Sequence, residues 1–296
     1  MPRFGPVLTA MVTPFDADGN VDFDGVATLA NWLVENGNDG IVVTGTTGEA
    51  SVLTDKEQVE VWRAVRGAVD VPVVAGSGTN DTAHAAELTA AAESAGMNGV
   101  LLVTPYYNRP SQAGIEAHFR AVAATTELPV ILYDIPVRTG RKVATETLLR
   151  LVEDVPNVVA VKDAAGNPAE SARLIASAPE GFELYSGDDS LTLPLLAVGA
   201  VGVIGVATHW VGREMAAMFA AFAAGHTAEA QRINASMIES FDFETGDDHP
   251  NPIPTKTLLR ELGLAVGECR LPMGPAPQGL AERARSVLHN LGRTVA

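Results

Sequence analysis

The sequence has few of the features that mark secreted and membrane-spanning proteins. Cys269 is the single cysteine in 296 residues, so no disulfide can form within the chain, as suits a reducing compartment. No apolar run approaches the roughly 20 residues that a membrane helix needs, and residues 1–6, with one arginine, do not resemble a signal peptide. These absences predict a cytoplasmic protein that does not bind a membrane.

Positive charge is also scarce. The chain has 20 Lys and Arg residues against 36 Asp and Glu residues, a formal net charge of −16. Because an acidic surface repels phosphate groups, we expect neither a nucleic-acid partner nor an anionic membrane surface. With 19% charged and 47% hydrophobic residues, the composition excludes a disordered chain.

No metal-binding pattern is evident. The six histidines are scattered, with no pair at the spacing of zinc ligands. Asp247, Asp248 and His249 form the nearest approach to a cluster, but no third and fourth partner is evident, which is more typical of a solvated loop. The sequence therefore predicts no metal site.

What the chain does have is alternation between short apolar runs and longer amphipathic segments of helical period. Continuous apolar runs are typical of parallel strands buried on both faces. Eight strand–helix units in residues 1–224 predict an α/β protein with a (β/α)8 TIM barrel. Residues 225–296 have a helical pattern, over 228–243, 255–262 and 280–291, and are predicted to form a C-terminal helical extension packed on the barrel. Thr54 and Glu57 have the spacing of a capping box, which predicts the start of an earlier helix. The predicted strands are 7–12, 40–43, 73–75, 100–103, 130–133, 158–161, 184–186 and 201–206.

An open doubly wound sheet is the alternative fold. Its phosphate-binding fingerprint requires a third glycine at the start of a helix, but Gly76-Ser77-Gly78 is followed by Thr79-Asn80-Asp81. The closed barrel is therefore favoured, and its active site is expected at the carboxyl ends of the strands.

The second predicted strand leads into residues 44–49, with the sequence TGTTGE. Two of its threonines lie between glycines, and such a turn can hold a carboxylate through hydroxyl and backbone N–H donors. A tight connector that caps the next helix is the other interpretation, and the sequence does not decide between them.

Lys162 is the strongest candidate for a catalytic residue. It is one of only four lysines and follows the apolar segment 157–161, whereas Lys56 and Lys142 lie in polar surroundings and are expected to be solvated. Burial lowers a lysine pKa, which makes a neutral amine available to attack a carbonyl. A structural ion pair with Asp163 or another acidic residue is the alternative.

Two further candidates come from the neighbouring strand. Tyr133 ends the predicted strand 130–133, so its phenol can face Lys162 and exchange protons with an oxygen bound there. Arg138 follows in a loop shaped by proline and glycine and could bind a substrate carboxylate, unless it forms a surface ion pair.

Taken together, these segments resemble the dihydrodipicolinate synthase family, part of the wider N-acetylneuraminate lyase superfamily of Schiff-base aldolases. The resemblance covers essentially the whole chain and rests on the joint order and spacing of seven segments. They are 45–49 (GTTGE), 104–110 (TPYYNRP), 133–140 (YDIPVRTG), 161–163 (VKD), 186–189 (SGDD), 202–204 (GVI) and 251–256 (NPIPTK).

The resemblance implies a lyase that condenses pyruvate with L-aspartate 4-semialdehyde to 4-hydroxy-tetrahydrodipicolinate, in diaminopimelate and lysine biosynthesis. Lys162 would form an imine with pyruvate, and Tyr133 would exchange a proton with the carbinolamine. Thr46 would relay that proton to Tyr107, which the family takes from a neighbouring subunit. The resemblance thus implies a tight dimer, usually paired into a homotetramer.

The same resemblance assigns the substrate-binding residues. Thr47 and nearby backbone amides would hold the pyruvate carboxylate, and Arg138 would bind the carboxylate of the semialdehyde. The main chains of Gly187 and Ile204 would line the lysine side of the cavity. No metal or organic cofactor is implied, because the imine itself withdraws the electrons.

The chain departs from the family at the pocket for feedback inhibition by lysine. Feedback-sensitive members have two histidines and a glutamate where this chain has Asp55, Gln58 and His84, whereas the family's residues remain at Asn80 and Tyr106. We therefore expect lysine to inhibit weakly or not at all.

Two other functions remain open at this point. A sister aldolase that cleaves a 2-keto-3-deoxy sugar acid or N-acetylneuraminate would use the same lysine and tyrosine with a different pocket for the second substrate. A catalytically silent barrel could act as a sensor of small acids or as a scaffold.

Overall fold

The eight strands follow one another in chain order as a closed barrel, which confirms the predicted fold class. The computed structural model describes residues 1–246 and 248–295. The strands are β1 (Val7–Ala10), β2 (Gly40–Val43), β3 (Val73–Gly76), β4 (Gly99–Val103), β5 (Val130–Asp134), β6 (Val158–Asp163), β7 (Glu183–Ser186) and β8 (Gly202–Gly205). Nearly every strand residue is buried, as the continuous apolar runs predict.

Two strand ends differ from the prediction in a way that matters for the site. β5 extends to Asp134, one residue beyond Tyr133, which is predicted as its end, and β6 extends to Asp163, so Lys162 lies within the strand and not after it. Backbone pairing between the two strands continues through Asp134 and Asp163, which fixes both candidate side chains on regular backbone.

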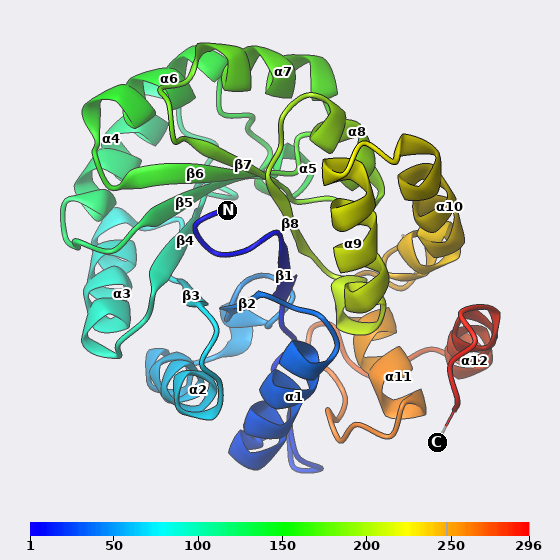
Figure 1. Cartoon of the computed structure of the whole chain (residues 1–296). Helices are drawn as coiled ribbons and strands as arrows, with labels where there is room; N and C mark the ends of the chain where they lie inside the picture. The colour runs from blue at the N-terminus through cyan, green and yellow to red at the C-terminus, as the bar shows by residue number, and fades with distance from the viewer. Residues whose placement is uncertain (247, 296) are drawn as a thin grey trace. The chain divides into compact units, whose positions relative to one another are not determined.

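The chain divides into two compact units, and the first consists of Met1–Pro6 and Pro72–Ile204. Figure 1 shows helices α3, α4, α6 and α7 of this unit outside the strands that they connect. Proline at the first turn begins both α5 and α7. The helices are α3 (Thr82–Ser94), α4 (Gln112–Ala123), α5 (Pro136–Thr139), α6 (Thr145–Asp154), α7 (Pro168–Ser177), the 3-10 turn η2 (Asp189–Leu191) and α8 (Thr192–Ala197).

The second unit consists of Val7–Val71 and Gly205–Ala296. The predicted capping box is present at the start of α2, where the side chains of Thr54 and Glu57 each accept a backbone N–H of the other. α10 packs along α9 and α12 along α11 (Figure 1). The helices are α1 (Phe23–Glu35), the 3-10 turn η1 (Ala50–Val52), α2 (Asp55–Ala68), α9 (Thr208–Ala223), α10 (Thr227–Phe243), α11 (Ile253–Glu261) and α12 (Leu280–Asn290).

The helices predicted for the C-terminal extension are confirmed to within a few residues. Residues 228–243, 255–262 and 280–291 correspond to α10, α11 and α12. The boundary at residue 224 between a barrel domain and an extension stays a prediction, because α9 and α10 pack together within one unit.

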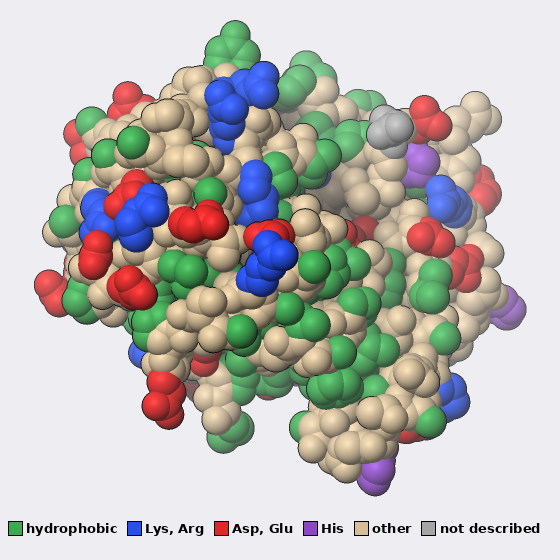
Figure 2. Space-filling view, turned by 90° about the horizontal axis from the view of Figure 1, so that it is seen from above, with side chains coloured by type: hydrophobic (Ala, Val, Ile, Leu, Met, Phe, Trp, Pro, Cys, Tyr) green, Lys and Arg blue, Asp and Glu red, His purple; other side chains and the backbone are tan. Residues whose placement is uncertain are grey.

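On the face drawn in Figure 2, basic side chains lie among acidic and apolar ones. No helix within residues 1–246 and 248–295 is long and apolar enough to span a membrane.

Candidate active site

Tyr133 and Lys162 meet in the first unit, as the sequence predicts. The two residues are paired across β5 and β6, and the Lys162 Nζ atom lies 4.4 Å from the centroid of the Tyr133 ring. Lys162 is 4% exposed and Tyr133 is 5% exposed. An amine and a phenol are therefore held together out of bulk water, an arrangement suited to attack on a carbonyl with proton exchange.

The surroundings keep the Tyr133 phenol protonated. Burial raises the pKa of Tyr133 well above its ordinary value; Arg138 opposes this rise, and the charges of Asp134 and Asp188 add to it. At neutral pH the side chain therefore has a proton to give and can accept one only as part of an exchange.

Gly187 leaves space for the lysine. A Cβ atom built on Gly187 would lie 3.0 Å from Lys162 Cγ and 3.1 Å from Lys162 Cε, closer than normal contacts. A side chain at this position would push the lysine aside. Ile204 is fully buried in β8, and the lining role predicted for its main chain stays a prediction.

Arg138 lies on the single helical turn α5, directly after β5, which the sequence analysis treats as a loop. The turn ends at Gly140, whose φ of +72° favours glycine. The side chain of Arg138 is exposed and forms no hydrogen bond or ion pair with another described residue, so the alternative of a surface ion pair is not observed within the described chain; its backbone N–H donates to Ile135 O at 3.0 Å. Its guanidinium is available to an anion.

Tyr107 is 89% exposed and has a left-handed φ of +70°. Such a backbone conformation is uncommon for a residue other than glycine, and residues of this kind cluster at functional sites. An exposed phenol on a constrained loop is suited to reach a neighbouring molecule.

The predicted carboxylate-binding turn, residues 44–49, belongs to the second unit. Thr47 is buried and its Oγ1 atom accepts a hydrogen bond from Asn251 Nδ2 at 2.8 Å, while Thr46 is exposed. No side chain caps the following turn η1, which removes support for the interpretation as a helix-capping connector. That Thr46 and Thr47 act together with Tyr133 stays a prediction.

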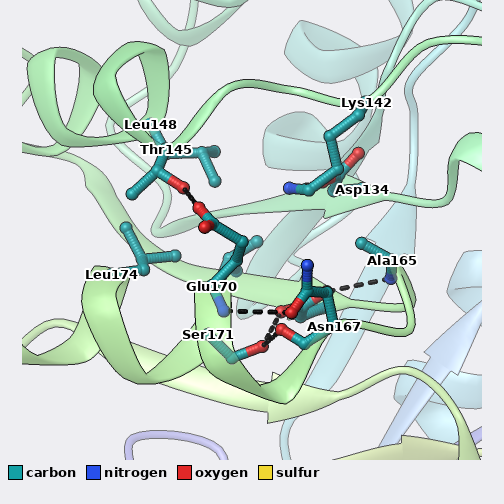
Figure 3. Close-up of a pocket in the computed structure, with 11 residues that line it drawn as sticks. Asp134, Lys142, Thr145, Leu148, Ala165, Asn167, Glu170, Ser171 and Leu174 are labelled. Carbon is teal, nitrogen blue, oxygen red and sulfur yellow. Dashed lines mark hydrogen bonds and ion pairs between the residues drawn. The ribbon is translucent and has the colours of Figure 1, made fainter.

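A polar pocket lies behind the two strands that carry Tyr133 and Lys162 (Figure 3). In it, Lys142 Nζ lies 2.5 Å from Asp134 Oδ2, and Asp163 accepts hydrogen bonds from Ser171 Oγ at 2.6 Å and from the Ala165 N–H at 2.9 Å. The cavity of about 10 Å³ has room for a single water molecule. Both carboxylates are therefore used to anchor the ends of β5 and β6.

Among the described residues there is no group of three or more His, Cys, Asp and Glu side chains that could hold a metal. Asp247, part of the nearest cluster in the sequence, lies outside the described residues, and His249 contacts the guanidinium of Arg283. The absence of a metal and of an organic cofactor stays a prediction.

Comparison with known proteins places this geometry in a family. The model of the dihydrodipicolinate synthetase family matches residues 3–291. The chain is 47% identical to 4-hydroxy-tetrahydrodipicolinate synthase of Moorella thermoacetica, over 98% of this chain and 99% of that one. The chain belongs to the dihydrodipicolinate synthetase family.

Solved members of the family have the same fold. The synthase from Cyanidioschyzon merolae with lysine bound is 43% identical, with a TM-score of 0.96 and 99% of each chain covered. The chloride-inhibited synthase from Acinetobacter baumannii complexed with pyruvate is 36% identical, with a TM-score of 0.92 and coverage of 98% of this chain and 99% of that one. These similarities confirm the resemblance that the seven sequence segments indicate.

Sequence reasoning misses several residues that shape this family site. Lys142 is partly exposed, but it also forms an ion pair with the buried Asp134, which the sequence analysis does not predict. Asp163, predicted as a possible partner of Lys162, instead has both carboxylate oxygens bonded on the helix side. Asn251 enters the sequence analysis only as the first residue of segment 251–256, and its distance in sequence from Thr47 gives no sign of the hydrogen bond between the two side chains.

Proposed function

We propose that this protein is a lyase that condenses pyruvate with L-aspartate 4-semialdehyde to 4-hydroxy-tetrahydrodipicolinate, in diaminopimelate and lysine biosynthesis. The observation that carries the proposal is the buried Lys162 amine 4.4 Å from the Tyr133 ring. The name shared by the curated relatives supports this reaction over cleavage of a sugar acid or N-acetylneuraminate. The single buried cysteine, Cys269, supports the cytoplasm as its compartment.

The first step is imine formation. The neutral Nζ atom of Lys162 attacks the keto carbon of pyruvate, and the carbonyl oxygen becomes the hydroxyl of a carbinolamine. Tyr133, protonated at neutral pH, gives its proton to that hydroxyl as it leaves as water, and the imine forms. Thr46 and Tyr107 relay the proton that restores the phenol.

The imine then acidifies the pyruvate methyl group, because the positively charged nitrogen accepts the electrons of the broken C–H bond. The resulting enamine attacks the aldehyde carbon of the second substrate. The amino group of the semialdehyde then displaces Lys162 from the imine carbon, which closes the ring and frees the enzyme. No metal or organic cofactor enters these steps.

Each of the two substrates has one carboxylate group, and each carboxylate has a proposed partner on the protein. Thr47 and the backbone amides of the 44–49 turn bind the pyruvate carboxylate, and Arg138 binds that of the semialdehyde. The main chains of Gly187 and Ile204 line the lysine side of the cavity. The exposed Tyr107 crosses the interface of a tight dimer, two of which form a homotetramer.

Reduction with borohydride in the presence of pyruvate tests the proposal. We expect one reduced pyruvyl adduct per chain, mapped to the peptide that contains Lys162. The Lys162→Arg variant, whose guanidinium stays protonated, should fold but form no adduct. An adduct on another lysine, or none in the parent protein, contradicts the mechanism, and turnover of sugar acids in place of the semialdehyde contradicts the substrate.

A further inference from the structure

The hydroxyl group of Thr47 is buried, and it accepts a hydrogen bond but donates none to the described residues. Thr47 is 3% exposed, and its Oγ1 atom accepts a hydrogen bond from Asn251 Nδ2 at 2.8 Å. Within residues 1–246 and 248–295, no atom accepts the hydrogen of this hydroxyl. A hydroxyl can donate one hydrogen bond, so a buried donor remains ready for an acceptor from outside the chain.

The orientation of Asn251 determines which way this hydrogen bond runs. An amide NH2 group can only donate, so Thr47 Oγ1 has to accept from it. The carbonyl oxygen of the same amide accepts from Thr255 Oγ1 at 3.2 Å, and the Asn251 backbone N–H donates to Thr245 Oγ1 at 3.3 Å. These contacts fix the amide with its NH2 group toward Thr47.

The 44–49 turn is also fastened at its far end. Glu49 has a left-handed φ of +58°, and its Oε1 atom lies 2.7 Å from the Nζ atom of the fully buried Lys256. The other carboxylate oxygen accepts the backbone N–H of Arg270 at 2.9 Å. Segment 251–270 thus holds the turn at Thr47 and at Glu49, which restricts the position of the Thr47 hydroxyl.

We propose that Asn251 is a positioning residue that makes the Thr47 hydroxyl a dedicated hydrogen-bond donor to the carboxylate of pyruvate. This inference rests on the proposed function, in which Thr47 binds that carboxylate. A carboxylate can only accept hydrogen bonds, and a hydroxyl whose oxygen is already occupied by an amide donor turns its hydrogen to the substrate. Asn251 itself need not touch pyruvate.

The Asn251→Asp variant keeps the size of the side chain but replaces the NH2 group, which donates to Thr47, with an oxygen that can only accept a hydrogen bond. The carboxylate still accepts from Thr255, but it now also accepts from Thr47 and takes the hydrogen meant for pyruvate. We expect the KM for pyruvate, and the pyruvate concentration for half-maximal trapping by borohydride, to rise roughly 10-fold or more. The KM for the semialdehyde should stay unchanged, because that substrate does not bind Thr47.

A cycle of variants separates this effect from charge repulsion and from damage to the fold. Asn251→Leu removes the donor without adding charge, and it should weaken pyruvate binding in the parent but not in a Thr47→Val background. Thr257→Val is the matched control, because Thr257 is buried on α11, the helix that follows Asn251, and its hydroxyl donates to Ile253 O within that helix. Thermal unfolding confirms that each variant is folded.

Three results overturn the inference: an unchanged pyruvate KM in both Asn251 variants, an equal rise in the KM of the two substrates, or additive effects of Asn251→Leu and Thr47→Val. Failure of the proposed function is distinguishable from these. It would appear in the parent protein as the absence of a pyruvate adduct on Lys162.

Discussion

Two buried carboxylates, Asp134 and Asp163, lie directly next in sequence to Tyr133 and Lys162. Since successive side chains of a strand point to opposite faces, the tyrosine and lysine share one face of the sheet while the two aspartates face the helices. Figure 3 shows Asp134 beside Lys142 in the pocket on that side. The strands that carry the reactive pair are therefore supported on their opposite face by a polar network.

Removal of the Lys142 charge should destabilise the protein in a pH-dependent way. Burial raises the pKa of Asp134 and Lys142 opposes that rise, so in Lys142→Met the pKa of Asp134 rises further above its unfolded value. A raised carboxyl pKa means that stability is lost as the pH increases and the carboxyl must ionise. Unfolding in urea should show a loss of about 1–3 kcal/mol at pH 8 and a smaller loss at pH 5.

The matched control is the double variant Asp134→Asn, Lys142→Met, in which no buried charge is left unpaired. It should recover most of the stability and lose the pH dependence. An equal loss at both pH values would show that Lys142 stabilises the fold through packing of its side chain alone.

At the residue scale, the sequence predicts the proposed reactive residues better than the residues that hold the neighbouring side chains in place. Lys162 and Tyr133 can be found because each lies at the end of an apolar run, and strand ends meet at one edge of a barrel. The ion pair of Lys142 is not predicted, because its neighbours in sequence are polar whereas its partner in space is a buried carboxylate. The contact between Asn251 and Thr47 joins positions 204 residues apart, and no spacing rule reaches that far.

At the scale of elements, the link between the 44–49 turn and α11 depends on one buried ion pair. Lys256 Nζ lies 2.7 Å from Glu49 Oε1, with side-chain exposures of 1% and 2%, and 4.0 Å from the centroid of the Phe15 ring. Burial lowers the pKa of Lys256, and Glu49 is the main group that opposes this fall. Each charge therefore depends on the other to remain in the core.

Lys256→Met should cost about 3–5 kcal/mol of unfolding free energy, because it leaves the Glu49 charge buried without its partner. Guanidinium unfolding checks this value, and Glu49→Gln combined with Lys256→Met should recover a large part of it. Lys56→Met is the control: Lys56 pairs with Glu60 at 3.8 Å on the surface, and its loss should change stability by less than about 1 kcal/mol. Equal losses in the two single variants would contradict the assignment.

The elements themselves are largely predictable from hydrophobic period. The eight strands and the three C-terminal helices appear where the pattern places them, and so does the capping box at α2. The short turns α5, η1 and η2 are not predicted, because three or four residues are too few to show a helical period. Such turns take their shape from the strands that precede them.

At the scale of the whole molecule, resistance to acid depends on histidines that the fold keeps neutral. His209 is fully buried; Val12 N–H donates to its Nε2 atom at 3.2 Å, and its Nδ1 atom lies 2.7 Å from Val206 O. Burial lowers the pKa of His209 from 6.5 to about 4. Protonation would remove the acceptor that Val12 uses and place a charge in the core.

The sign of the resulting pH dependence follows from the depressed pKa. Above pH 6.5 the ring is neutral in both states, whereas between pH 6.5 and about 4 only the unfolded chain takes up the proton. The free energy of unfolding should therefore fall by roughly 1.4 kcal/mol per pH unit in this window through His209 alone. In urea unfolding, His209→Gln should lower stability at pH 7 and flatten the slope, and His226→Gln, at an exposed position, should leave the slope unchanged.

The expected weakness of inhibition by lysine belongs to the scale of the whole molecule, because the resemblance implies a lysine pocket at a dimer interface. Feedback-sensitive members use two histidines and a glutamate where this chain has Asp55, Gln58 and His84, and a changed set of charges and donors cannot pair in the same way with an ammonium and a carboxylate. We expect no half-inhibition by L-lysine below about 1 mM, which corresponds to a binding free energy weaker than about −4 kcal/mol. Steady-state assays with both substrates at their KM values, across a lysine titration, measure this directly. A variant that restores the family residues at the three positions should become inhibited, whereas strong inhibition of the parent would mean that lysine is bound by other groups, such as Asn80 and Tyr106.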